Sequence, residues 1–278
     1  MFFSTLFFAL ANVFVKKVSH LPTMEIVFLR CLVGSAFCFI GLRHVRADWR
    51  GTNHKLLLLR GMFGTSALYF FFLTLQNIPL ASAMTIQYLS PIFTAIIAIF
   101  ALKEKVKPLQ WIFYAIAFGG VLFIERFDAR ISLYFLFVGV VSALCSGAAY
   151  NLVRTLRGRE HPLVVVFHFQ IVGLIVGLVF SIFNWETPHG ADWFYLFLIG
   201  LLSQFGQMFL TGAFQKERAA NVAIVNYTGL IYGLLIGWFV FGETQAIESL
   251  LGMILVVIGV GLSVFYNRNK IQIHESLG

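Results

Sequence analysis

Charge is scarce in this 278-residue chain: only 12% of its residues are charged, whereas 59% are apolar. No Asp or Glu lies in the middle of a long apolar run, because all twelve carboxylates fall at run ends, in loops or in the tail. Such a composition exceeds what a soluble domain tolerates and indicates an integral membrane protein. Without a buried carboxylate, a proton relay built on Asp or Glu is unsupported, which favours facilitated diffusion, exchange or weak coupling.

Cysteine and catalytic motifs are scarce as well. Cys31, Cys38 and Cys145 lie inside apolar runs without paired spacing or a neighbouring His cluster, and we interpret them as small core side chains. No Gly-rich phosphate loop, HExxH or GxSxG occurs. The sequence therefore points to no cofactor, no metal and no enzymatic activity.

What the chain does have is ten apolar runs of helix length, without the short alternation of a membrane barrel. Because Lys16 and Lys17 follow the short first run rather than precede it, that run is not expected to be a cleaved signal peptide. The predicted fold is all-α, with ten transmembrane helices. The predicted spans are 2–15, 24–42, 56–75, 81–102, 109–124, 131–152, 163–182, 193–214, 219–241 and 247–266.

The chain also repeats itself when it is shifted by 139 residues, half its length. Each copy carries five spans, and an odd number makes the second copy cross the bilayer in the opposite direction. The predicted domains are a first repeat, 1–126, and a second, inverted repeat, 127–278. Inverted repeats are typical of alternating-access transporters. The pairs that match without a gap include Asn12/Asn151, Gly34/Gly173, Tyr88/Tyr227, Glu104/Glu243 and Gly120/Gly259.

The cations predict an orientation, because Lys and Arg are retained on the cytoplasmic side. With both termini inside, fifteen cations, Arg60 among them, face the cytoplasm and four face outwards. The net charge of +8 is then a topology signal, and no nucleic-acid partner is expected. We expect a multi-pass protein of a bacterial cytoplasmic (inner) membrane, as a monomer or weak homodimer. Glu104 and Glu243 are expected to cap the following helix or to bind loop cations.

In each copy a span ends in a short turn with Glu, and the next span has a late Gly. These motifs resemble the EamA-type repeats of the drug/metabolite transporter superfamily. In the first copy, residues 75–83 leading into Ser90-Pro91 resemble that family's passage from the third to the fourth helix, and Arg30 matches an Arg often found in its second helix. The resemblance implies a transporter whose central cavity is formed mainly by the first, third, fourth, sixth, eighth and ninth helices.

Polar side chains inside the spans indicate the same cavity independently, because an unpaired polar group facing lipid is costly. Amides and tyrosines suit an uncharged or zwitterionic metabolite, although each could instead hold helices together or fill the core. Arg30 could bind a substrate carboxylate or phosphate, cap helix carbonyls, pair with Glu25 or snorkel to the surface. The candidate substrate-binding residues are Asn12, Arg30, Tyr69, Gln87, Tyr88, Tyr150, Asn151, Gln204, Gln207, Asn226, Tyr227 and Trp238.

The predicted function is secondary transport of a small polar or zwitterionic metabolite by alternating access, as an exporter or exchanger. Its partners would be the small-molecule substrate and the lipid bilayer. Pro91 and a glycine stripe in the ninth span offer points for bending and sliding. The alternative is a flippase for a lipid-linked head group, which would need a lateral opening between helices.

Overall fold

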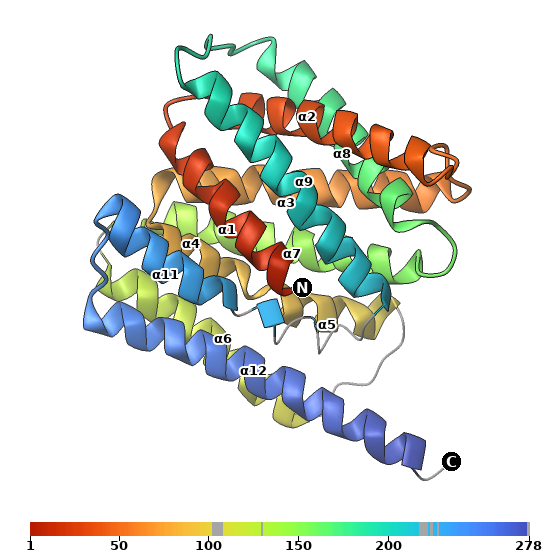
Figure 1. The fold of residues 1–278 in the computed structure, drawn as a ribbon. Helices are drawn as coiled ribbons and strands as arrows, with labels where there is room; N and C mark the ends of the chain where they lie inside the picture. The colour runs from red at the N-terminus through yellow and green to blue at the C-terminus, as the bar shows by residue number, and fades with distance from the viewer. Residues whose placement is uncertain (102–107, 129, 217–221, 223–224, 227, 277–278) are drawn as a thin grey trace.

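The computed structural model describes residues 1–101, 108–128, 130–216, 222, 225–226 and 228–276, and its elements are helices (Figure 1). The ten predicted spans are found as helices, the ninth only in part within the described residues. Among the described residues, six helical stretches are long and apolar enough to cross a membrane, and one of them, Leu80–Ile99, runs over two consecutive helices. The bounds of the helices are α1 Phe2–Lys17, α2 Thr23–His44, α3 His54–Asn77, α4 Leu80–Gln87, α5 Ser90–Ala101, α6 Pro108–Phe127, α7 Leu133–Thr155, α8 Pro162–Ser181, α9 Asp192–Lys216, α11 Thr228–Phe241 and α12 Ile247–Ser276.

The fourth predicted span differs from the prediction, because it is two helices rather than one. α4 ends at Gln87 and α5 begins at Ser90, with Tyr88 and Leu89 forming a turn between them. Pro91 explains the break, since it lacks an N–H group and its ring disfavours a continuous helix through the preceding turn, whereas the first turn of a new helix accepts it. The break carries Tyr88 into the interior, where 5% of it is exposed.

Helices from the two halves of the chain pack side by side throughout the bundle. α1 packs on α9, α2 on α8, α3 on α7, and α6 on α12, which together form one edge of the molecule (Figure 1). The α6–α12 contact requires glycine, because a Cβ at Gly120 would lie 2.7 Å from the Gly252 carbonyl oxygen and one at Gly259 would lie 2.7 Å from that of Phe113. Small residues let helix backbones approach this closely.

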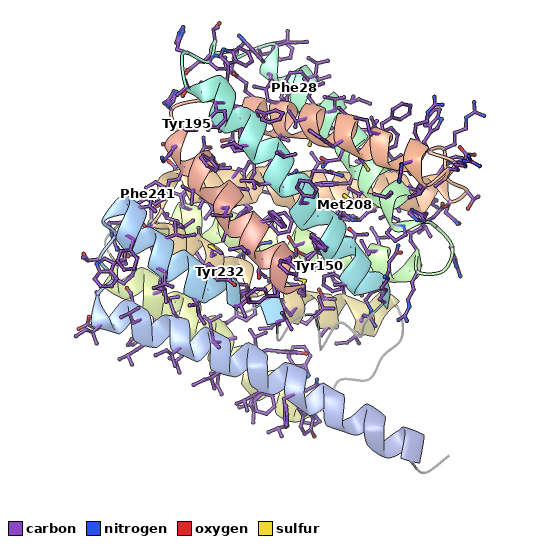
Figure 2. The ribbon with its side chains drawn as sticks, viewed as in Figure 1. Phe28, Tyr150, Tyr195, Met208, Tyr232 and Phe241 are labelled. Carbon is purple, nitrogen blue, oxygen red and sulfur yellow. The ribbon has the colours of Figure 1, made fainter. Side chains whose placement is uncertain are left out.

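Large apolar side chains cover the outer faces of the helices (Figure 2). Phe137 on α7, Phe183 after α8 and Phe239 on α11 are 67%, 77% and 74% exposed. An exposed apolar surface of this extent is typical of a chain whose outer solvent is lipid. Most buried polar side chains lie in the interior between the helices, which is where the candidate site is found.

Candidate functional site

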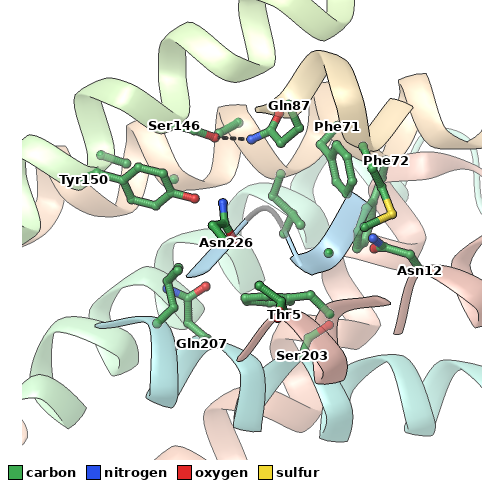
Figure 3. A pocket seen from close by; sticks show the side chains of 18 of the residues that line it. Thr5, Asn12, Phe71, Phe72, Gln87, Ser146, Tyr150, Ser203, Gln207 and Asn226 are labelled. Carbon is green, nitrogen blue, oxygen red and sulfur yellow. Dashed lines mark hydrogen bonds between the residues drawn. The ribbon is translucent and has the colours of Figure 1, made fainter. Parts of the chain in front are cut away.

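A cavity of about 160 Å³ lies in the middle of the bundle (Figure 3). It is lined from α1, α3, α4, α7, α9 and α11, which belong to the six spans that the resemblance implied, and also from α2 and α8. Among the described residues, α6 and α12 contribute nothing to the lining. Seven of the twelve predicted residues line it: Asn12, Arg30, Gln87, Tyr88, Tyr150, Gln207 and Asn226.

Gln87 carries two roles at once, because it lines the cavity and also joins α4 to α7. Its Nε2 donates to Oγ of Ser146 at 2.7 Å (Figure 3), and its Oε1 lies 3.0 Å from Oγ of Ser142. Tyr150, one turn beyond Ser146 on the same face of α7, stacks its ring on Phe214 at 4.6 Å between centroids. These contacts hold the polar wall of α7 in one orientation.

Two predicted residues are instead used in contacts between helices. Asn151 donates to the Thr94 carbonyl at 2.9 Å, which joins α7 to α5, and Gln204 accepts from Gln170 at 2.8 Å, which joins α9 to α8. Neither lines the cavity formed by the described residues. Interhelix hydrogen bonding was the alternative that the sequence left open for such side chains.

Of the remaining three predicted residues, two lie away from the cavity lining and the third is outside the described residues. Tyr69 packs its ring against Phe70 at 5.3 Å and is not among the cavity-lining residues of the described chain. Trp238 is 60% exposed and packs on Phe239 at 4.8 Å, so its position on α11 turns it to the outer surface. Tyr227 lies outside the described residues.

Arg60 is the charged cavity residue that sequence reasoning missed. It was counted as a cytoplasmic cation, whereas the structure buries it to 2% exposure in the cavity wall. The signal was present, because Arg60 lies six residues into α3 and Arg30 lies seven residues into α2. Arg30 is likewise 2% exposed and forms no ion pair with Glu25, so neither snorkelling nor that pairing describes it.

An ion pair lies one helical turn beyond Asn12, the cavity residue of α1 nearest to it in sequence. Lys16 at the end of α1 pairs with Glu243, and it also donates to the Ile78 carbonyl at 3.1 Å. Glu243 in turn accepts the N–H of Leu80 at 2.9 Å, at the start of α4. Glu243 was expected either to bind a cation or to cap the helix that follows it. It binds the cation Lys16, and the helix start that it caps is that of α4. Its repeat partner Glu104 lies outside the described residues.

A second carboxylate orders the opposite end of the bundle. Glu160, between α7 and α8, accepts the backbone N–H groups of Thr52 and Asn53 at 2.6 Å each and the Thr52 hydroxyl at 2.7 Å. Partial burial acts to raise the pKa of Glu160, but these hydrogen bonds outweigh it and hold the pKa below its ordinary value. The loop after α2 is therefore tied to the loop before α8.

Comparison with known proteins agrees with this architecture. The EamA-like transporter family matches twice, at residues 1–126 and 133–265. The pseudopaline exporter of Pseudomonas aeruginosa is 29% identical over 254 residues, which cover 90% of this chain and 89% of the exporter. A solved crystal structure with 15% sequence identity covers 96% of both chains at a TM-score of 0.71, which shows a shared fold.

Other similar proteins differ in what their names describe. Human solute carrier family 35 member G1 is 26% identical and covers 96% of this chain and 79% of its own length. The S-adenosylmethionine uptake transporter of Rickettsia felis is 26% identical and covers 93% of this chain and 88% of its own. The chain belongs to the EamA-like transporter family, within the drug/metabolite transporter superfamily. It is an integral, multi-pass membrane transporter and not an enzyme.

Proposed function

We propose that this protein moves a small polar or zwitterionic metabolite across the membrane by alternating access. The observation that carries the proposal is the central cavity, which is polar on several walls. We infer that the Lys16–Glu243 pair, one turn beyond Asn12, closes one end of it. Transporter sites are commonly found near the midplane, between repeats whose helices can rock against each other. Relatives named as an exporter and as an uptake transporter support transport of a small metabolite in one direction or the other.

The proposed mechanism includes an inverted duplication, for which reciprocal contacts give support. A Cβ at Gly34 would meet Gln170, and one at Gly173 would meet Cys31; these contacts exchange when 139 is added or subtracted. The approach of Gly120 to Gly252 has its counterpart in the approach of Gly259 to Phe113, and the same shift of 139 residues relates the two contacts. Contacts that exchange pairwise are those of a two-fold axis, and five spans per copy would place that axis in the membrane plane.

The volume of the cavity supports a small solute. A cavity of about 150 Å³ holds a solute the size of benzene, and this one is about 160 Å³. An amino-acid-sized solute is therefore favoured over the lipid-linked head group of the alternative flippase function. Asn226, Gln207 and Ser203 supply hydrogen-bond donors and acceptors for its uncharged polar groups.

We also propose that both termini are cytoplasmic and that the protein resides in a bacterial inner membrane. Because Arg60 is buried, it no longer counts as a cytoplasmic cation. Fourteen cations then remain on the cytoplasmic side against four on the outer side, so the excess of cytoplasmic positive charge persists. The closed Lys16–Glu243 end would then face outwards. In this orientation the structure would represent a state closed to the outside.

The test is counterflow in proteoliposomes. Purified protein is first screened by thermal shift against single amino acids, and a stabilising solute is then tested for accumulation of its radiolabelled form into vesicles preloaded with the unlabelled form. We expect accumulation, with Asn226→Ala and Gln207→Ala each reducing it about tenfold or more by loss of hydrogen bonds to substrate. Trp238→Ala, on the outer surface, should leave it unchanged.

Two results would contradict the proposal. A solute that binds but is never exchanged would show that the protein is not a transporter of that solute. Normal exchange in the Asn226→Ala, Gln207→Ala double variant would show that the route does not pass through this cavity.

A further inference from the structure

Two arginines face the cavity from neighbouring helices and share one aromatic ring. The guanidinium carbon of Arg60 lies 4.6 Å from the ring centroid of Phe169, and that of Arg30 lies 5.5 Å from the same centroid. Arg30 also lies 5.9 Å from the ring centroid of Phe72. Both arginines are 2% exposed, so the two cations are held almost entirely out of bulk solvent.

Within the described part of the chain, neither cation has an acidic partner. The cavity lining, as formed by the described residues, contains these two arginines and no Asp or Glu. Nε of Arg30 and both Nε and Nη1 of Arg60 are buried without a hydrogen-bond partner in the described part of the chain. An uncompensated buried charge is strongly unfavourable, and the attraction of an aromatic face offsets only part of that cost.

The backbone of α3 makes room for this arrangement. Gly64 lies one turn after Arg60, and a Cβ at Gly64 would collide with Nη1 of Arg60 and approach the Phe169 ring to 2.8 Å. The absent side chain therefore lets the guanidinium fold back along α3 against Phe169. A long cation held inside by the local sequence, instead of reaching the surface, is characteristic of a functional intramembrane charge.

We infer that Arg30 and Arg60 form the carboxylate-binding end of the cavity, so that the transported solute carries at least one carboxylate. The planar guanidinium group presents paired N–H donors that match the two oxygens of a carboxylate. The two guanidinium groups, which line the cavity and have three nitrogens without a partner in the described part of the chain, supply those donors. The neutral side chains of Asn226, Gln207 and Ser203 remain for the rest of the solute. This inference adds a substrate class to the proposed function. Binding of a carboxylate is argued from the arginines themselves, whereas its transport rests on the proposed function.

The experiment measures binding, so that its failure can be told apart from a failure of transport. Thermal unfolding of the detergent-purified protein is followed with succinate, with succinamide, which has the same carbon skeleton without charge, and with inorganic phosphate. We expect succinate to raise Tm and succinamide to have no effect. Arg30→Gln and Arg60→Gln should each raise the succinate concentration for half-maximal shift about ten- to hundredfold, as expected for charged hydrogen bonds.

The chain offers a matched control in the same helix. Arg43 on α2 also lies over a phenylalanine, 5.1 Å from the Phe39 centroid, but it is exposed outside the cavity. Arg43→Gln should bind succinate like the unsubstituted protein. Arg60→Met adds a readout that a structural arginine would not give: removing an unpaired buried charge should raise Tm without ligand while abolishing the succinate shift.

Three results would overturn the inference. Equal stabilisation by succinate and succinamide would show that the carboxylate is not recognised. Stabilisation by phosphate alone would assign the arginines to a phosphoryl group instead. A lowered Tm in Arg60→Met together with an unchanged succinate shift would show that Arg60 only supports the fold.

Discussion

If the Lys16–Glu243 pair holds one end of the cavity closed, as proposed, replacing Glu243 by Gln should open that end. Glu243 joins α1 through Lys16 and α4 through the Leu80 N–H, and it packs over Gly237 of α11, where a Cβ would lie 3.0 Å from its Oε2. Asn12 on α1 and Gly229 on α11 line the cavity one and two turns deeper. Separation of these helices would expose the cavity at this end.

The size of the effect follows from what Gln retains. Its amide oxygen can still accept the Leu80 N–H, but the attraction to Lys16 as an ion is lost. A hydrogen bond to a charged group contributes about 1.5–3 kcal/mol, and we take the lower part of that range because the Lys16 side chain is 17% exposed and the Glu243 side chain 9%. A loss of about 1.5–2 kcal/mol raises the ratio of open to closed molecules roughly ten- to thirtyfold.

The assay measures the accessibility of one introduced thiol. With the three native cysteines replaced, Asn12→Cys places a thiol one helical turn inside Lys16 on the same face of α1. A membrane-impermeant maleimide is added to each side of oriented vesicles in turn. Glu243→Gln should increase the labelling rate roughly ten- to thirtyfold from the Lys16 side while the closed state predominates, and should not increase it from the other side.

Asp192→Asn is the matched control. It replaces the carboxylate that contacts His20, whose side chain is 56% exposed, and such exposed contacts contribute little. Neither Asp192 nor His20 lines the cavity formed by the described residues. The labelling rate of the Asn12→Cys thiol should therefore stay within about twofold when Asp192→Asn is added. An unchanged rate in Glu243→Gln, or an equal increase in both variants, would refute the assignment of Lys16–Glu243 as the closing contact.

Two further predictions concern stability. Gly120→Leu should lower Tm sharply because a Cβ there meets the backbone of α12, whereas Gly119→Leu, with nothing within 4 Å of its Cβ position, should cost little; equal losses would contradict the close α6–α12 contact. Because the folded-state pKa of Glu160 is depressed, its stabilisation should be present above the unfolded value near 4.5 and be lost as pH falls through the lower folded value. Glu160→Gln should therefore lower Tm at pH 7 and have little effect in acid below both values, and a difference that persists there would contradict it.

The spans could be predicted from sequence because hydropathy is a local property of the chain. Each long apolar run must satisfy its own backbone hydrogen bonds in lipid, and helix formation achieves this without reference to any other segment. Even the interruption of the fourth span had a local cause in Pro91, although its consequence, the inward placement of Tyr88 at the turn, appeared only in the structure.

The use of individual polar side chains could not be predicted in the same way. Gln204 and Gln207 lie three residues apart on one stripe of α9, yet Gln204 is bonded to Gln170 of α8 and Gln207 lines the cavity. Asn12 and Asn151 correspond in the repeat, yet Asn12 lines the cavity and Asn151 is bonded to the Thr94 carbonyl. Periodicity indicates an inward face, but the neighbouring helix decides whether that face meets a partner or open space.

By itself, then, the sequence determined an integral membrane protein of ten helices with an internal 139-residue repeat and no buried carboxylate at mid-span, because composition and spacing carry that information. Only the tertiary structure decided that Arg60 joins Arg30 around Phe169 and that Lys16 meets Glu243 across 227 residues of chain. The physical reason is that burial and pairing of a charge depend on which distant helices surround it, and the segment that carries the charge does not encode those neighbours.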